Sequence, residues 1–128
     1  MATFNSRKEI NMSFASKYQK RRFNANTQGF DYHTLGELFK TEQAHGVTVK
    51  YPIKAIYINT QSEYGESPVI ATDVCYVNLP AHLTDVCKQM IADAETVDEI
   101  NAGKAGFTIY AYEDRHGTER YSVNWIDL

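Results

Sequence analysis

The stretch KYPIKAIYINTQSEYGESPVIATDVCYVN (residues 50–78) predicts a β-hairpin, with the loop QSEYGESP (61–68) between its strands. A second hairpin is predicted by AGFTIYAYE (105–113), the turn DRHG (114–117) and TERYSVNWIDL (118–128). Both are rich in β-branched and aromatic residues, and each is interrupted by turn-forming residues. In the first strand both faces are partly apolar between residues 53 and 58, which suits a long curved strand shared between two sheets.

Between the hairpins the apolar spacing changes to that of helices. A stripe at i, i+3, i+4, i+7 and i+8 is formed by Leu83, Val86, Cys87, Met90 and Ile91. A shorter helix is predicted within residues 93–103, where Thr96 and Glu99 fit a capping box. Strand, strand, helix, strand, strand predicts a mainly β fold with helices. We expect a five-stranded barrel like the oligonucleotide-binding (OB) fold, with the helical segment between strands 3 and 4.

The 128 residues suffice for one globular domain. We place it at residues 29–128 and treat residues 1–28 as a basic, aromatic, flexible N-terminal arm. Within the domain, Thr34 and Glu37 resemble a capping box and predict a helix near residues 34–44. An alternative makes residues 30–35 an edge strand, because Phe30 and Tyr32 alternate with polar neighbours.

Charge is distributed unevenly along the chain. Residues 1–26 carry six Lys or Arg and one Glu, whereas residues 27–128 carry seven basic and fifteen acidic side chains. Basic groups interleaved with aromatic rings can neutralise phosphates and stack on bases. A terminal tail that aids solubility, or an arm packed on a partner subunit, is the alternative.

Aromatic residues are the second indication of a binding surface. Tyr110 and Tyr112 lie two residues apart on the face opposite Phe107 and Ile109, about 6 to 7 Å along a strand. Tyr57 and the loop residue Tyr64 are further candidates for stacking. The complete predicted nucleic-acid-binding set is Lys17, Lys20, Arg21, Arg22, Phe23, Lys50, Lys54, Tyr57, Tyr64, Tyr110, Tyr112, Arg115 and Arg120.

Patterns typical of catalysis are missing from the sequence. Its four histidines lie far apart, and neither they nor the two cysteines have metal-ligand spacing. No phosphate-binding glycine motif or nucleophile elbow occurs. We therefore expect no enzyme activity, no cofactor, no metal and two reduced, buried cysteines. Without an apolar stretch of about 18 residues or a signal peptide, the protein is expected to be cytoplasmic.

The stretches AIYINTQSEYGESPVIATDVCYVNLPAHL (55–83) and AGFTIYAYEDRHGTERYSVNWIDL (105–128) resemble a group of small phage and mobile-element proteins from Gram-positive bacteria. These are similar to single-stranded DNA-binding proteins of the OB fold. The resemblance implies sequence-nonspecific binding of single-stranded DNA in replication or recombination. It also implies a bacterial host cell, a homo-oligomer, a dimer or higher, and replication or recombination proteins as partners. The alternative function is an acidic interaction module or phage inhibitor that mimics nucleic acid or docks on a host enzyme.

Overall fold

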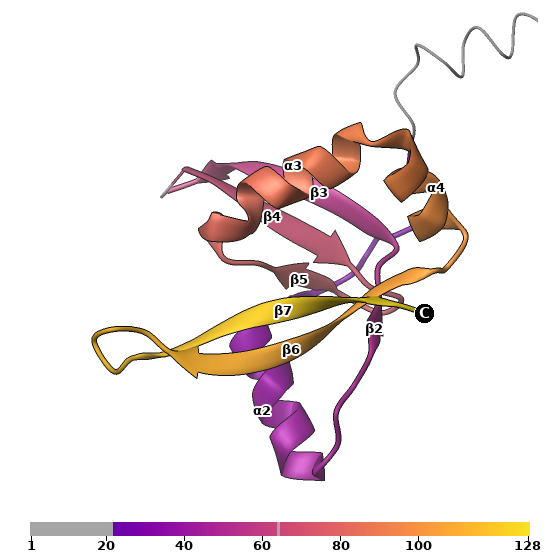
Figure 1. Cartoon of the computed structure of the whole chain (residues 1–128). Coiled ribbons are helices and arrows are strands. Elements are labelled where there is room, and N and C mark those ends of the chain that lie inside the picture. Colours follow the sequence, from indigo (N-terminus) through magenta and orange to yellow (C-terminus); the bar gives the residue numbers. More distant parts are fainter. Residues whose placement is uncertain (1–21, 64) are drawn as a thin grey trace, which may run out of the picture.

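Two open β-sheets and four helices make up the structure, a computed structural model that describes residues 22–63 and 65–128 (Figure 1). In chain order the elements are β1 (Tyr32–Thr34), α2 (Leu35–His45), β2 (Tyr51–Pro52), β3 (Ala55–Ser62), β4 (Gly65–Ala71), β5 (Tyr76–Asn78), the short 3-10 helix η1 (Ala81–Leu83), α3 (Thr84–Ala92), α4 (Ala94–Asn101), β6 (Ala105–Glu113) and β7 (Glu119–Asp127). One sheet has the order β1-β5-β4-β3 and the other β2-β6-β7. With 38% strand and 30% helix, the fold is mixed α/β rather than mainly β.

Both predicted hairpins form, but the predicted loop over residues 61–68 is wrong, because β3 extends to Ser62 and β4 begins at Gly65, with Ser67 and Pro68 paired to Asn59 and Ile58. β3 and β4 pair antiparallel with Tyr57 opposite Val69, and β6 and β7 pair antiparallel with Tyr110 opposite Ser122. The helices η1, α3 and α4 lie between them in the sequence, as predicted. In Figure 1 the tips of both hairpins project to the same side of the molecule, and α3 lies over the sheet that contains β3 and β4.

One continuous stretch of chain joins the two sheets. β2 pairs with β6, whereas β3, three residues further on, pairs with β4. The change of partner occurs within two residues, because the Ile53 amide donates to the Ala105 carbonyl (3.0 Å) and the Lys54 amide to the Ala71 carbonyl (2.8 Å). The prediction of a strand shared between two sheets is therefore confirmed.

The sheets do not close into a barrel within the described residues, which form seven strands where five were predicted. Helix α2 begins directly after β1 and packs on β6 and β7, a position that the barrel prediction left out. Its Phe39 ring lies 5.5 Å from the ring of Tyr121. A Cβ on Gly36 would lie 3.0 Å from that same ring, so the absent side chain allows the close approach. The helix thus occupies space beside the open edges of the two sheets.

The predicted strand over residues 69–78 is interrupted by a turn at Thr72. The Thr72 hydroxyl donates to the Cys75 carbonyl and accepts from the Cys75 amide, both at 3.1 Å, and from the Val74 amide at 3.2 Å. Hydroxyl side chains that bond nearby backbone groups compete with strand pairing in this way. Two antiparallel strands, β4 and β5, result.

Two helix starts differ in how well the capping pattern predicts them. The two interpretations of residues 30–44 are both realised, because β1 pairs in parallel with β5 and Thr34 then caps α2 by accepting from the Glu37 amide. α4 begins at Ala94, two residues before the predicted cap Thr96. Thr96 instead donates its hydroxyl hydrogen to the Asp93 carboxylate at 2.7 Å.

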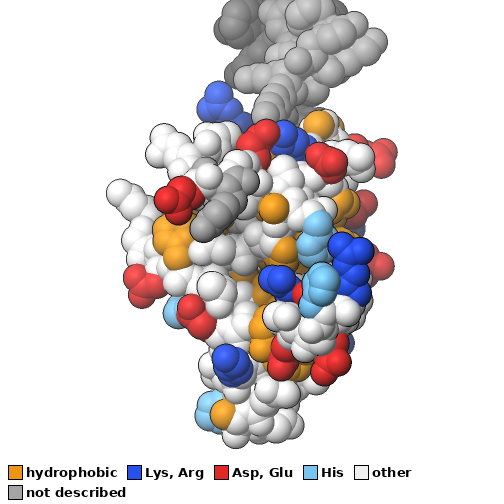
Figure 2. Space-filling model, turned by 90° about the vertical axis from the view of Figure 1, so that its left-hand side faces the viewer, with side chains coloured by type: hydrophobic (Ala, Val, Ile, Leu, Met, Phe, Trp, Pro, Cys, Tyr) orange, Lys and Arg blue, Asp and Glu red, His pale blue; other side chains and the backbone are white. Residues whose placement is uncertain are grey.

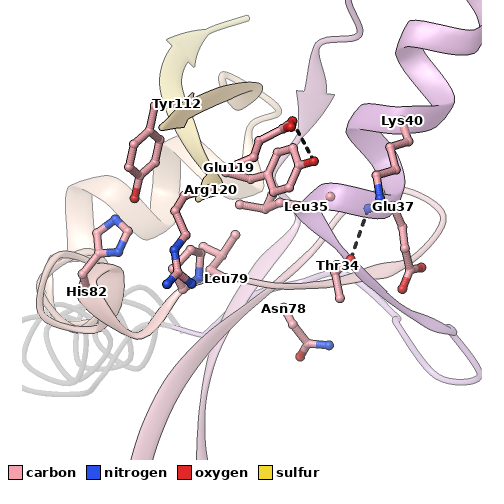
Figure 3. Close-up of a pocket in the computed structure, with 13 residues that line it drawn as sticks. Thr34, Leu35, Glu37, Lys40, Asn78, Leu79, His82, Tyr112, Glu119 and Arg120 are labelled. Atoms are coloured by element: carbon pink, nitrogen blue, oxygen red, sulfur yellow. Dashed lines mark hydrogen bonds between the residues drawn. The ribbon is translucent and has the colours of Figure 1, made fainter. Parts of the chain in front are cut away.

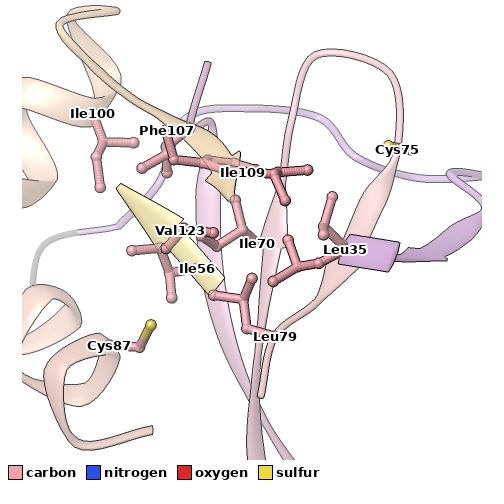
Figure 4. Packing of buried hydrophobic residues seen from close by; sticks show 12 residues of the cluster. Leu35, Ile56, Ile70, Cys75, Leu79, Cys87, Ile100, Phe107, Ile109 and Val123 are labelled. Atoms are coloured by element: carbon pink, nitrogen blue, oxygen red, sulfur yellow. The ribbon is translucent and has the colours of Figure 1, made fainter. Parts of the chain in front are cut away.

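The core fills the space between the two sheets (Figure 4). Ile56 and Ile70 come from the four-stranded sheet, Phe107 and Ile109 from the three-stranded sheet, and all are buried. Cys75 and Cys87 are free and buried, as predicted, and burial raises the pKa of the Cys87 thiol to about 11.

The end of the predicted arm is packed on the domain. Phe23 packs against the core, and Asn101 of α4 binds the backbone on both sides of it. The Asn24 amide donates to the Asn101 side-chain oxygen (2.9 Å), and the Asn101 side-chain nitrogen donates to the Arg22 carbonyl (3.0 Å). Residues 22–24, predicted as part of the arm, therefore pack on the domain. Residues 1–21 lie outside the described part of the chain.

Candidate nucleic-acid interface

Three tyrosine side chains gather on one surface of the four-stranded sheet. We call Tyr32 of β1, Tyr57 of β3 and Tyr76 of β5 the tyrosine face. Tyr32 and Tyr76 are direct neighbours across the parallel pair, and their rings stack with centroids 4.7 Å apart at 27°. The Tyr57 ring meets Tyr76 edge-on at 6.1 Å and 73°. Tyr32 is 62% exposed and Tyr57 41% exposed, so aromatic surface remains available.

The segment before β1 holds these rings in place. The Thr27 hydroxyl, which is buried, lies 2.6 Å from the Tyr76 hydroxyl and 3.4 Å from the Tyr57 hydroxyl. Phe30 packs edge-on against Tyr76 at 5.6 Å. Rings that are held in place before a ligand arrives lose less conformational entropy on binding.

A cavity of about 530 Å³ opens over the tyrosine face. Its other lining residues are Asn59, Val69 and Asn78. Planar rings and side-chain amides can contact nucleobases, whereas neither lysine nor arginine lines this cavity. The described lining of this cavity is therefore uncharged and partly aromatic.

Arg22 and Phe23 line an adjoining cavity of about 560 Å³ together with Tyr57. The basic segment of the sequence therefore joins the domain beside the tyrosine face. Lys88 also lines this cavity but is paired with Glu66 at 2.9 Å. The described residues hold eight Lys or Arg and fifteen Asp or Glu, so the basic residues of 1–21 matter for the total charge available to bind phosphate.

A second surface lies between the two sheets, beside α2. We call the cavity there, of about 660 Å³, the seam cavity; it is lined by α2, the end of β5, η1 and the β6–β7 hairpin. In Figure 3 the side chains of His82 and Tyr112 point toward one another across it, and Arg120 extends between them and Leu79. Figure 2 shows the side of the molecule from which the hairpin tips project, where Lys, Arg and His side chains gather beside an apolar band.

Arg120 is positioned by the turn of its own hairpin. Its Nε donates to the Asp114 carboxylate at 3.0 Å, and the amides of His116 and Thr118 donate to the same carboxylate. The Arg120 hydrogen bond, followed by those two amides, lowers the pKa of Asp114. The DRHG turn thus serves a structural role by orienting Arg120.

The structure separates the predicted binding residues into several regions. Tyr57 belongs to the tyrosine face, whereas Tyr110 and Tyr112 lie on the three-stranded sheet, so the predicted aromatic set does not occupy one sheet. Tyr110 and Tyr112 are 39% and 38% exposed with rings 6.0 Å apart, which confirms that they lie on the outer face. Of this pair only Tyr112 lines the seam cavity.

The predicted basic track is not continuous in the described structure. Lys50 is exposed before β2, and Arg115 is exposed in the hairpin turn. Lys54 is half-buried and lines a different, smaller cavity with Thr72 and Asp73. Arg120 alone of these four lines the seam cavity. The predicted residues Lys17, Lys20, Arg21 and Tyr64 lie outside the described residues.

Sequence reasoning missed Tyr32 and Tyr76 of the tyrosine face and Lys40 and His82 of the seam cavity. Alternation with polar neighbours is visible around Phe30 and Tyr32, and Tyr76-Val77-Asn78 alternates in the same way. The proximity of the two tyrosines depends on the parallel pairing of β1 with β5 across 44 residues of sequence. No local pattern shows such a pairing.

Membrane-spanning helices and metal-binding clusters are both absent from the part of the chain that the structure describes. No helix there is long and apolar enough to cross a membrane. Among the same residues, no group of three or more His, Cys, Asp or Glu side chains is placed to hold a metal ion. No protein-family model, curated protein or solved structure was found to match the chain.

Proposed function

We propose that this protein binds single-stranded DNA without sequence specificity and without enzymatic activity. The observation that carries the proposal is the tyrosine face, on which three packed rings line a single cavity. Arg22, the last of the N-terminal basic residues, lines the adjoining cavity. Stacking on aromatic side chains contributes about 1 to 3 kcal/mol per base and tolerates any base. Two or three such contacts, added to phosphate contacts, are enough for a functional affinity.

The arrangement of strands supports the proposal. We propose that the fold is an opened form of the OB barrel, in which β2 and β3 together act as its long first strand. Tyr57 and Tyr76 then lie on the surface formed by this strand and the next two, close to the surface that OB folds use for oligonucleotides, and β1 adds Tyr32 beside them. A role in replication or recombination of a phage or mobile element, and a homo-oligomeric state, belong to the same proposal.

Phosphate contacts are assigned mainly to the N-terminal basic residues. Arg22 lies beside Tyr57, and Arg21, Lys20 and Lys17 precede it by one, two and five residues. An extended chain spans at most about 3.6 Å per residue, so the basic groups nearest Arg22 stay within reach of the same surface. Each phosphate contact on a single strand makes the binding constant depend more steeply on salt.

A second candidate function is an acidic protein-interaction module. Exposed carboxylates on and between α3 and α4 favour it: Asp85, Asp93, Glu95, Asp98 and Glu99. Such a protein would bind a basic host protein and would not bind DNA. The same experiment tests both functions.

The test is titration of the full chain into fluorescein-labelled dT20 at 50 and 200 mM salt, with a duplex of equal length as competitor. We expect binding that weakens with salt and resists the duplex. Tyr57→Ala should weaken it by 5-fold or more, and Tyr57→Phe by less than 2-fold, because the ring remains. Absence of binding at 50 mM salt would exclude the proposal and favour the acidic module.

A further inference from the structure

We infer that a bound DNA strand continues from the tyrosine face into the seam cavity, where one nucleotide places its base on Tyr112 and its phosphate near Arg120, while Lys40 faces the same cavity from α2 on the opposite side. The inference rests on the proposed function and adds a second nucleotide-binding site to it. The seam cavity has about 660 Å³, within the range of small-molecule sites, and it combines apolar walls with a few polar groups.

Asn78 connects the two sites. It is the last residue of β5 and lines both the cavity over the tyrosine face and the seam cavity. Tyr76 and Asn78 lie two residues apart and point to the same side of the strand, a step of about 6 to 7 Å. A DNA strand with one base stacked on Tyr76 can therefore extend along the exposed amide of Asn78 to the entrance of the seam cavity.

The aromatic part of the seam suits a nucleobase. Tyr112 exposes part of its ring, and His82 on η1 is exposed and points toward it (Figure 3). Two planar side chains on separate elements can contact a base from different directions. Tyr110, by contrast, is equally exposed on the same strand but does not line the cavity.

The polar part of the seam suits a phosphate. Arg120 uses Nε for Asp114, and a guanidinium has further N–H groups that can donate to phosphate oxygens. The side chain of Lys40 makes no hydrogen bond or ion pair with any other residue in the described ranges.

Two carboxylates also line the cavity, and each has a partner. Glu37 contacts His33 at 3.1 Å, and Glu119 accepts from the Tyr121 hydroxyl at 2.9 Å. Lys40 and Arg120 therefore remain available to an entering anion.

The experiment compares a short and a long oligonucleotide, dT2 and dT15, because a dinucleotide bound on the tyrosine face does not reach past Asn78 into the seam cavity. Tyr112→Ala is expected to weaken dT15 binding about 5- to 150-fold and dT2 binding less than 2-fold. Trp125→Ala, the matched control, removes an exposed ring that lines neither cavity and should change neither by more than 2-fold. Tyr57→Ala should weaken both. Tyr112→Phe should retain dT15 binding, and thermal unfolding of each variant establishes that it is folded.

Charge provides an independent readout. Lys40→Gln should lower the log–log salt slope for dT15 by about 0.7 and leave that for dT2 unchanged. Lys104→Gln, which changes an exposed lysine outside the cavity, should alter neither slope. If Tyr112→Ala and Trp125→Ala behave alike with both oligonucleotides, the seam cavity does not bind the DNA strand. If the unmodified protein binds neither oligonucleotide, the proposed function itself fails.

Discussion

Replacing Tyr32 with alanine tests the tyrosine face at the residue where folding is least affected. The side chain is 62% exposed on a three-residue edge strand, so its removal leaves no closed cavity in the core. The loss of stability comes mainly from its stacking on Tyr76, an interaction of a type that contributes about 0.5 to 1.5 kcal/mol. For a domain of this size, that corresponds to a fall in Tm of roughly 2 to 12 °C.

The effect on binding should be larger than the effect on folding. Removal of one base stack costs about 1 to 3 kcal/mol, which raises the Kd roughly 5- to 150-fold. Fluorescence anisotropy with labelled dT15 at 25 °C measures the Kd, and circular dichroism measures the Tm of the same sample. Tyr32→Phe is the control, because it keeps the ring and removes only the hydroxyl. An unchanged Kd for a folded Tyr32→Ala variant would refute the assignment of this surface.

Four further predictions concern the N-terminal residues, the packed Phe23 ring, the strand crossing and the buried thiol. Deletion of residues 1–21 should leave the Tm within a few degrees and lower the log–log salt slope by about 0.7 for each phosphate group that these residues bind; an unchanged slope would show that they do not touch DNA. Phe23→Ala should lower the free energy of unfolding by about 1 to 3 kcal/mol in urea, less than truncation of a fully buried ring, because Phe23 is half-buried. Gly106→Ala should cost about 1 to 3 kcal/mol or prevent folding, since its Cβ would lie 2.7 Å from the Tyr51 carbonyl oxygen; a Tm equal to that of the unmodified protein would contradict this close approach of β2 to β6. Because the folded-state pKa of Cys87 is raised to about 11, its contribution to stability is complete below about pH 8.5 and is lost as pH rises toward 11, so Cys87→Ala should show a smaller fall in Tm between pH 8 and 10.5.

Local patterns predicted the elements of this fold well, because their causes are local. The hairpins follow from alternation and turn residues, and the cap of α2 follows from Thr34 and Glu37. The packing of α2 on Tyr121 depends instead on the missing side chain of Gly36, a role that only the packed structure shows.

The candidate site likewise combines residues that local patterns predict with residues that only long-range pairing brings together. Exposure of Tyr110 and Tyr112 could be predicted from strand alternation alone, whereas the strand that carries Tyr57 is partly apolar on both faces and gave no such prediction. Whether these three rings act together depends on which sheet each strand joins, and the sequence does not indicate that β3 and β6 belong to different sheets. Tyr32 and Tyr76 become neighbours only through a pairing between distant segments.

The hydrogen bonds of Asn101 to the backbone of Arg22 and Asn24 have a consequence for how binding is built up. They anchor the basic segment at a fixed point next to Tyr57, so any phosphate held by that segment keeps the rest of the strand close to the rings. The stacking step then becomes intramolecular, with an effective concentration in the millimolar range for a short flexible connection. Two weak contacts can thereby act as one stronger binding site, and loosening this anchor would lower affinity without removing a single group that touches DNA.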